Sequence, residues 1–191
     1  MRLGVLGGTF DPPHVGHLIV ASDVCAALGL DRLLFVPAAA PPHKRGRVCA
    51  PAALRLEMVR AATAGDARFE VDDLELRREG ESYSADTLRQ LAAREPDAQL
   101  FFVIGVDQLR EFASWREPDV VARLATLVVV SRAGEDAADA GEVAFPVLPV
   151  QVTRIDLSAT EIRSRVQDGE PIRYLVPDAV REIIEREGLY G

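Results

Sequence analysis

The first residues of this chain contain the feature that most restricts its fold, which is an apolar run, a glycine turn and a helical pattern in direct succession. Leu3 to Leu6 are apolar, Gly7 and Gly8 follow, and apolar residues at helical spacing continue from Leu18. A strand that turns sharply into a helix presents unpaired backbone N–H groups and the positive end of the helix dipole. Such a corner binds anions, phosphate groups above all. These residues therefore predict an α/β fold with a phosphate-binding corner.

The rest of the chain alternates strands with helices. Strands are expected at 2–6, 33–36, 69–76, 100–104 and 127–130, with 147–150 and 154–157 as candidate extensions of the sheet. Helices are expected at 15–28, 52–64, 84–94, 118–124 and after 158 and 177. This order predicts a Rossmann-like open parallel sheet with helices on both faces. We expect one nucleotide-binding domain over residues 1–191, in which residues 158–191 form a small helical appendage packed on the same core.

Composition excludes several classes of protein. The net charge of −8 argues against general nucleic-acid binding, which needs a basic surface. No apolar run approaches the ~20 residues of a membrane span, and no signal peptide precedes the first strand, so we expect a cytoplasmic protein without membrane contact. Cys25 and Cys49 have no C-x-x-C partner, and Cys25 lies on the apolar stripe of the first helix, which favours a buried thiol. The oligomeric state is left open, and a homo-oligomer is possible.

Two histidines follow the glycine turn. His14 and His17 are three residues apart and share a face of the predicted helix, where both could donate hydrogen bonds to phosphate oxygens. A lone histidine is more often a packed core residue, and a metal site would need three or four ligands, for which only Asp11 is near. The glycines do not form G-x-G-x-x-G, so a redox dinucleotide site is disfavoured.

The run Gly7-Gly8-Thr9-Phe10-Asp11-Pro12, followed by His14-Val15-Gly16-His17, resembles the signature of the H-x-G-H nucleotidyltransferase superfamily and, within it, the bacterial nicotinate-nucleotide adenylyltransferase family. The resemblance implies adenylyl transfer from ATP to nicotinate mononucleotide, with Mg²⁺ accompanying ATP and no metal ligands from the protein. It implies catalytic roles for His14, His17, Lys44 and Arg163. It implies ATP contacts from Gly7, Gly8, Thr9, Phe10, Asp11, Gly16, Gly105, Asp107, Ser158 and Thr160.

Lys44 belongs to the segment Pro41-Pro42-His43-Lys44, which matches the family's P-P-H-K. It is the single lysine among 22 basic residues. A compact ammonium on a proline-stiffened segment could neutralise a triphosphate in the transition state. A solvated basic loop is the alternative.

Three further segments match the family's patterns. Ser82 to Leu88 resembles S-Y-T-x-D-T-L, and Leu157 to Arg163 resembles I-S-S-T-x-I-R, in which Ser158 and Glu161 also fit a capping box. Asp107 follows a strand end in a G-x-D and could simply cap a helix. Trp115 has polar neighbours, which suit a stacking platform better than a core position. The resemblance implies mononucleotide contacts from Ser84, Ala85, Thr87, Trp115 and Arg116.

Two other readings stay open. Another transferase of the superfamily could act on nicotinamide mononucleotide or phosphopantetheine. A non-catalytic nucleotide sensor could use the same pocket, although it would not need His14, His17 and Lys44 together.

Overall fold

The fold was analysed in a computed structural model, which describes residues 1–39, 49–132 and 145–191. These residues form a parallel sheet of six strands in the order β3-β2-β1-β4-β5-β6. The strands are β1 (Arg2–Gly8), β2 (Arg32–Pro37), β3 (Phe69–Val71), β4 (Gln99–Gly105), β5 (Thr126–Arg132) and β6 (Val147–Val152). The strand order reverses between β1 and β4, so the Rossmann-like parallel sheet is confirmed.

The helices begin and end at residues with local signals. They are α1 (Val15–Leu28), α2 (Ala52–Thr63), α3 (Ser84–Arg94), α4 (Val106–Glu111), the 3₁₀ turn η2 (Phe112–Ser114), α5 (Pro118–Leu124), α6 (Ala159–Gln167) and α7 (Asp178–Glu187). Gly29 and Gly188 end α1 and α7 in the left-handed conformation, and Pro118 occupies the first turn of α5. The bounds expected for α1, α3 and α5 are confirmed, and for α1 and α5 these signals lie in the adjacent sequence.

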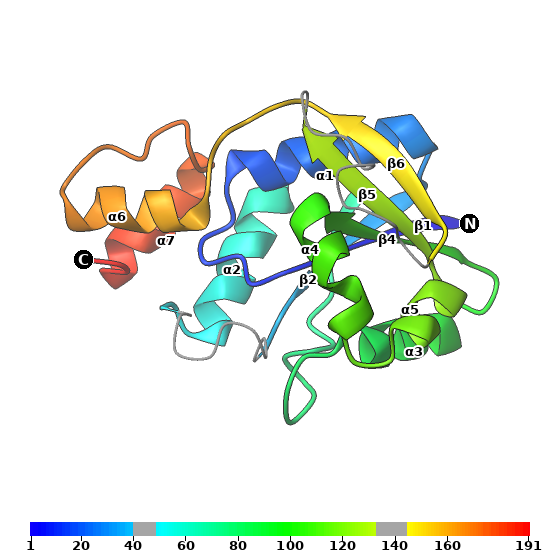
Figure 1. The fold of residues 1–191 in the computed structure, drawn as a ribbon. Coiled ribbons are helices and arrows are strands. Elements are labelled where there is room, and N and C mark those ends of the chain that lie inside the picture. The colour runs from blue at the N-terminus through cyan, green and yellow to red at the C-terminus, as the bar shows by residue number, and fades with distance from the viewer. Residues whose placement is uncertain (40–48, 133–144) are drawn as a thin grey trace.

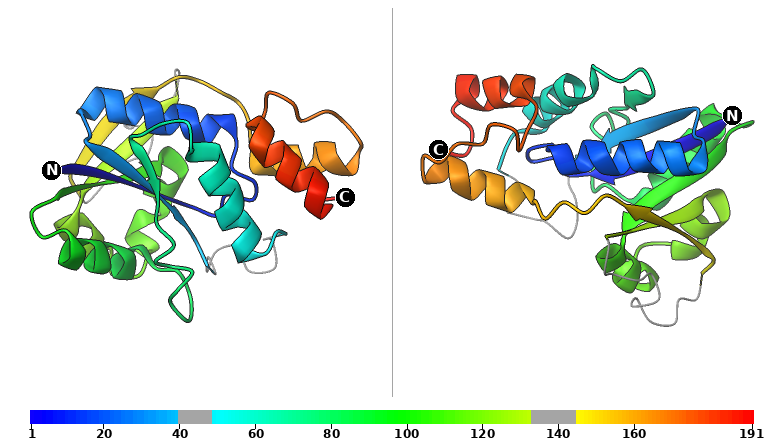
Figure 2. Two further views of the ribbon diagram at one scale, coloured as in Figure 1. Left: turned by 180° about the vertical axis from the view of Figure 1, so that it is seen from behind. Right: turned by 90° about the horizontal axis from the view of Figure 1, so that it is seen from above.

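The sheet is buried on both faces, which explains its nearly continuous apolar strands. Leu33 and Phe35 pack with α1 and α2, whereas Leu34 and Val36, their neighbours in β2, pack with α3, α4 and α5. Figures 1 and 2 show these two helical layers on opposite sides of the strands. The alternation of side chains in a strand thus fills two cores.

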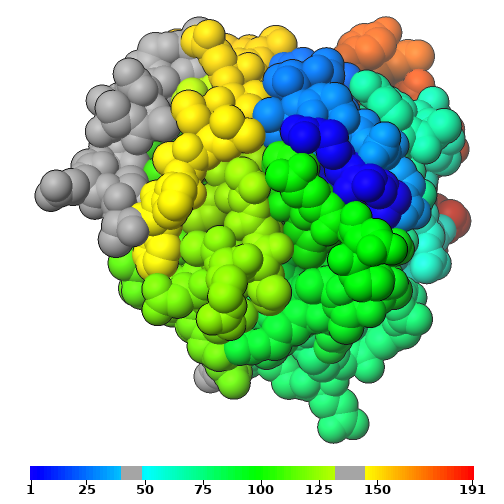
Figure 3. Space-filling view, turned by 90° about the vertical axis from the view of Figure 1, so that its right-hand side faces the viewer, coloured from blue at the N-terminus to red at the C-terminus, as the bar shows by residue number. Residues whose placement is uncertain are grey.

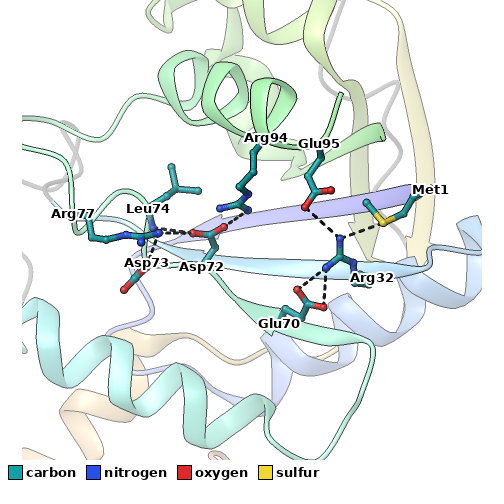
Figure 4. A network of polar contacts seen from close by, with 9 residues as sticks. All are labelled: Met1, Arg32, Glu70, Asp72, Asp73, Leu74, Arg77, Arg94 and Glu95. Atoms are coloured by element: carbon teal, nitrogen blue, oxygen red, sulfur yellow. Dashed lines mark hydrogen bonds and ion pairs between the residues drawn. The ribbon is translucent and has the colours of Figure 1, made fainter. Parts of the chain in front are cut away.

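The strand expected at 69–76 is shorter than predicted, because β3 ends at Val71. Asp72 is 8% exposed, and its carboxylate accepts the Leu74 N–H at 3.0 Å. The same carboxylate pairs with Arg94 and with Arg77, as Figure 4 shows. The alternation of acidic and apolar residues suggested a strand, but the Asp72 side chain caps a turn instead.

Residues 154–157 do not extend the sheet, so that expectation was wrong. They run instead from β6 to the start of α6, past the carboxyl ends of the strands (Figure 1). There α6 and α7 pack against α2 through a separate apolar cluster that includes Met58, Ile162, Val180 and Ile184. The chain leaves the sheet because this cluster offers another place to bury its apolar side chains.

The sheet has two different ends. The amino ends of the strands, toward which Figure 3 looks, form the surface around the start of β1, and α6 appears there only at the margin. The carboxyl ends point toward α6 and α7 (Figure 1). Ligands of open parallel sheets bind at the carboxyl ends, next to the point where the strand order reverses. No helix in the described part of the chain is long and apolar enough to cross a membrane.

Candidate active site

A cavity of about 640 Å³ opens at the carboxyl ends of the strands. This volume is in the usual range for small-molecule sites. Five regions of the chain contribute to its wall: the loop after β1, the first turn of α1, the end of β4, the ends of β5 and β6, and the first turn of α6. The predicted site residues in the wall are Gly7, Gly8, Thr9, Phe10, Asp11, His14, Gly16, His17, Gly105, Ser158, Thr160 and Arg163.

The two histidines occupy the start of α1. His14 is the N-cap residue, in extended backbone conformation, and its N–H donates to Nδ1 of His17 at 3.1 Å. The rings stack with their centroids 3.7 Å apart, and the edge of Phe10 packs on His17 at 5.0 Å. Because Nδ1 of His17 accepts this hydrogen bond, the neutral ring carries its proton, and therefore its hydrogen-bond donor, on Nε2.

Two glycines make room for these rings. A Cβ atom at Gly8 would lie 2.8 Å from the Phe10 ring, and one at Gly16 would lie 3.0 Å from Nδ1 of His14. Both separations are too short for ordinary carbon contacts, so the glycines permit the loop to fold back on itself. Phe10 has a φ of 49°, and its side chain is 2% exposed. Burial of the ring offsets the cost of that backbone conformation.

Arg55 supports the loop from below, and the sequence did not reveal it. Its side chain is 1% exposed and donates to the carbonyl oxygens of Thr9 and Ala38, each at 2.7 Å, and of Ala50 at 3.2 Å. Desolvation lowers the pKa of Arg55, and the negative charge of Asp11 opposes that shift. The buried guanidinium thus ties the loop after β1 to both described ends of the segment that contains residues 40–48.

The start of α6 forms a second polar corner of the cavity. The Ser158 hydroxyl accepts the Glu161 N–H at 3.1 Å, which confirms the N-cap half of the predicted capping box. Arg163, one turn later, donates to the Thr160 hydroxyl at 3.2 Å and to the carbonyl oxygen of Asp11 at 2.8 Å. Arg163 therefore joins the start of α6 to the loop after β1, although 152 residues separate it from Asp11.

Of the two residues predicted at the end of β4, one lines the cavity. Gly105 lines the cavity, but Asp107 is not among the lining residues; its side chain is 95% exposed and pairs with Arg110. Gln108 lines the cavity instead and accepts the Gly105 N–H at 3.0 Å. The N-cap alternative for Asp107 is wrong, because Gly105 is the N-cap of α4. Other lining residues that the sequence did not indicate are Val20, Val130, Thr153 and Ile155.

The residues predicted to bind the mononucleotide lie outside the cavity wall but close to one another. Ser84 and Ala85 are the first two residues of α3, so their N–H groups have no acceptor within the helix. The Arg116 guanidinium lies 4.5 Å from the centre of the Tyr83 ring, and Arg89 on α3 binds Glu117 at 2.5 Å. These contacts bring the start of α3 to the segment that contains Trp115 and Arg116.

Trp115 is half-buried and packs edge-on against Phe102 and at a tilted angle against Phe112. A Cβ atom at Gly7 would lie 4.0 Å from the Phe102 ring, so a single side chain separates the tryptophan from the end of β1. The backbone N–H of Trp115 donates to the Phe112 carbonyl at 3.0 Å, so this amide already has an acceptor. The ring is therefore the part of Trp115 that is available to a ligand.

Thr87 is placed differently from the expectation of direct contact. Its side chain is 2% exposed, and its hydroxyl donates to the Glu75 carboxylate. In this conformation the hydroxyl supports the fold of α3 on the turn after β3.

Lys44 lies outside the described residues, as do His43, Arg45 and Arg47. Nowhere in residues 1–39, 49–132 and 145–191 do three or more histidine, cysteine or carboxylate side chains gather as metal ligands would. Of the two cysteines, Cys25 is buried, as predicted, and Cys49 is exposed.

Comparisons with known proteins show the family to which the chain belongs. Residues 5–165 match the model of the cytidylyltransferase-like family. A probable nicotinate-nucleotide adenylyltransferase of Thermus thermophilus is 47% identical over 190 residues, which cover 100% of both chains. A protein with the same description from Geobacillus thermodenitrificans is 45% identical over 100% of this chain and 86% of its own.

The same fold is present in solved structures of low sequence identity. Plasmodium falciparum nicotinic acid mononucleotide adenylyltransferase, complexed with NaAD, superposes with a TM-score of 0.80 at 17% identity over 99% of this chain and 97% of its own. A putative nicotinate-nucleotide adenylyltransferase of Vibrio parahaemolyticus gives a TM-score of 0.71 at 20% identity, over 99% of this chain and 94% of its own. The chain belongs to the cytidylyltransferase-like family and, within it, to the nicotinate-nucleotide adenylyltransferases.

Proposed function

We propose that this chain transfers the adenylyl group of ATP to nicotinate mononucleotide, giving nicotinate adenine dinucleotide and pyrophosphate. One observation carries the proposal. The starts of α1 and α6 meet at one cavity, together with His14, His17 and Arg163. Two helix N-termini and three cationic or hydrogen-bonding side chains suit a polyphosphate. The full-length relatives, which are described as probable nicotinate-nucleotide adenylyltransferases, support the choice of reaction.

The reaction needs positioning and charge neutralisation more than proton transfer. The 5′-phosphate of the mononucleotide attacks the α-phosphorus of ATP, and pyrophosphate leaves in line. The attacking phosphate is ionised near neutral pH, so no general base is required. We assign His14 and His17 to the ATP phosphates, and Arg163 and Lys44 to the charge that develops on pyrophosphate.

Mg²⁺ enters this scheme with ATP. Among the described residues that line the cavity, Asp11 has the only carboxylate, and that group accepts hydrogen bonds from the Cys49 N–H, the Ala50 N–H and the Tyr190 hydroxyl. A donor set of this kind fits an ion that the nucleotide phosphates hold, as Mg²⁺ is commonly bound. When bound, the ion neutralises phosphate charge.

The second substrate is assigned to the neighbouring segments. We call the residues lining the cavity the ATP half, and Ser84–Thr87 with Trp115–Glu117 the mononucleotide half. The Trp115 ring can stack on a pyridine, and the N–H of Ser84, the first residue of α3, can bind an anionic group, whereas Ala85 is buried. The cytoplasmic location and the possible homo-oligomer remain predictions.

Two alternative functions predict different results with ATP and its acceptors. A nicotinamide-mononucleotide or phosphopantetheine adenylyltransferase would use the same ATP half with another acceptor. A non-catalytic nucleotide sensor would bind ATP without turnover.

The test is pyrophosphate release from ATP and Mg²⁺ in the presence of each candidate acceptor, with the dinucleotide product identified by mass. The proposal predicts release with nicotinate mononucleotide and a product that contains one adenylyl group. Binding of ATP without release, whatever the acceptor, would favour the sensor. Release with phosphopantetheine alone would replace the proposed substrate.

A further inference from the structure

The last-but-one residue of the chain reaches the loop of the candidate active site. Gly188 ends α7, the Leu189 N–H returns to the Ile184 carbonyl at 3.0 Å, and Tyr190 folds under the loop after β1. Its hydroxyl donates to Oδ1 of Asp11 at 2.8 Å, across 179 residues of sequence. Tyr190 is 9% exposed, so this contact is made in the interior.

The Asp11 carboxylate is held from three sides. It accepts the Tyr190 hydroxyl and the N–H groups of Cys49 and Ala50, the latter two at 2.7 and 3.0 Å. Asp11 is 3% exposed, and a buried carboxylate needs such donors to balance the loss of water. Loss of one donor would therefore let the carboxylate rotate or would leave one of its oxygens without a partner.

Asp11 passes this restraint to the groups that face the cavity. Its carbonyl oxygen accepts the Arg163 guanidinium at 2.8 Å, and His14 follows three residues later in the same loop. Asp11, His14 and Arg163 all line the cavity. A shift of Asp11 thus moves an anchor of Arg163 and the residue that begins α1.

Tyr190 acts here only as a hydrogen-bond donor. Burial, and then the adjacent negative charge of Asp11, raise the pKa of the Tyr190 hydroxyl, so it keeps its proton across the working pH range. The hydroxyl lies behind Asp11, and Tyr190 does not line the cavity. It is thus unsuited to proton exchange with a substrate there.

We propose that Tyr190 is a positioning residue for adenylyl transfer, because its hydroxyl, through Asp11, holds His14 and Arg163 in place for the phosphates of ATP. This inference rests on the proposed function. If Tyr190 served stability alone, loss of its hydroxyl would affect the use of both substrates equally. The proposal instead predicts that this loss weakens the use of ATP and not that of the mononucleotide.

The test compares Tyr190→Phe with Tyr174→Phe. Both substitutions remove a hydroxyl from the C-terminal appendage, but Tyr174 is 79% exposed. We expect Tyr190→Phe to lower kcat/KM for ATP about tenfold, since small misplacements of reacting groups have effects of this order or larger. The KM for nicotinate mononucleotide should stay within about twofold of the parent value. Tyr174→Phe should leave every constant unchanged.

Thermal unfolding and calorimetric binding of a non-hydrolysable ATP analogue accompany the kinetics, and each constant is expressed per folded protein. Weaker analogue binding by Tyr190→Phe, with an unchanged mononucleotide KM, supports the proposal. An unchanged kcat/KM for ATP overturns it, as does a parallel loss for both substrates.

If Tyr190→Phe does not fold, a chain that ends at Leu189 is measured in the same way, and failure of both variants to fold assigns Tyr190 to stability alone and overturns the proposal. If the parent chain shows no turnover, the proposed function fails, and the analogue-binding arm alone then decides whether Tyr190 shapes the nucleotide site.

Discussion

Two arginines support the two halves of the candidate site in opposite ways. Arg55 is buried under the ATP half and donates to backbone carbonyls, whereas Arg89 lies on the surface of the mononucleotide half and pairs with Glu117. Buried carbonyl groups that lose their donor cannot form hydrogen bonds with water instead, whereas the partners of an exposed ion pair can. The loop of the ATP half is therefore supported from the interior of the fold, whereas the ion pair that joins the two segments of the mononucleotide half lies on the surface and can be replaced at small cost.

The largest expected effect is on the chemistry of the ATP half. His17→Ala should lower kcat about 100- to 1,000-fold, as removal of a preorganised donor to a developing charge commonly does. The melting temperature should change little, because His17 is only half-buried. Steady-state kinetics and thermal unfolding measure the two effects. Asp107→Asn, outside the cavity wall, is the control, and near-normal turnover of His17→Ala would remove this residue from the mechanism.

Arg55→Leu should give the largest loss of stability. It leaves the carbonyls of Thr9, Ala38 and Ala50 without their donor in the interior, which should lower the free energy of unfolding by about 3–5 kcal/mol. Urea denaturation followed by circular dichroism measures this change. Arg60→Leu removes an exposed arginine from the same helix and is the matched control. Equal effects of the two substitutions would contradict the special role of Arg55.

Arg163→Ala should weaken the use of ATP by about 100-fold in kcat/KM, since it removes a charged partner of the phosphates. Arg165, two residues along α6, pairs with Glu161 and does not line the cavity. Arg165→Ala should therefore behave like the parent enzyme. A similar loss in both variants would indicate a general effect of charge on α6 instead of a specific contact.

The residues of the ATP half show which parts of the site can be predicted from the sequence. The glycines and histidines of 7–17 were predictable because turn, helix start and side-chain spacing are local properties. The role of Arg55 was not predictable. Its acceptor on Thr9 is 46 residues away, and nothing in the sequence of α2 indicates that Arg55 is the fully buried arginine of this helix. The role of Tyr190 was not predictable either, because its partner is 179 residues distant.

The same distinction explains the errors in the fold. Residues 72–76 have the alternation of a strand, but a side-chain cap on Leu74 overrides it. Residues 154–157 have apolar character that the cluster between α2, α6 and α7 uses in place of the sheet. Thr87 and Asp107 match family patterns, yet one is buried on Glu75 and the other points into solvent, since a pattern of letters does not fix the direction of a side chain.

In the mononucleotide half, Trp115→Ala should raise the KM for nicotinate mononucleotide roughly tenfold, the order of a lost stacking contact. The KM for ATP should stay near the parent value, because Trp115 does not line the cavity. Trp115→Phe retains an aromatic face and should recover most of the affinity. Initial-rate kinetics with each substrate varied in turn test this split, and a loss confined to ATP would contradict it.

The smallest effect is expected from the surface pair that joins α3 to the segment after Trp115. Arg89→Gln should raise the KM for the mononucleotide only a few-fold, because the pair is exposed to water. The hydrogen bond from Arg89 lowers the pKa of Glu117, so its contribution to stability is present above the normal carboxyl pKa and is lost as pH falls through the lowered value. The stability difference between parent and variant should therefore disappear in acid. A stability difference that persists in acid would show that it does not come from the Arg89–Glu117 pair.

The central claim is that the mononucleotide half selects a pyridine nucleotide with a carboxylate. The most direct test is a comparison of kcat/KM for nicotinate mononucleotide and nicotinamide mononucleotide, at the same ATP and Mg²⁺ concentrations. The account predicts a preference of at least about tenfold for the acid, because anion-binding N–H groups gain little from a neutral amide. Equal specificity constants for the two mononucleotides would contradict it.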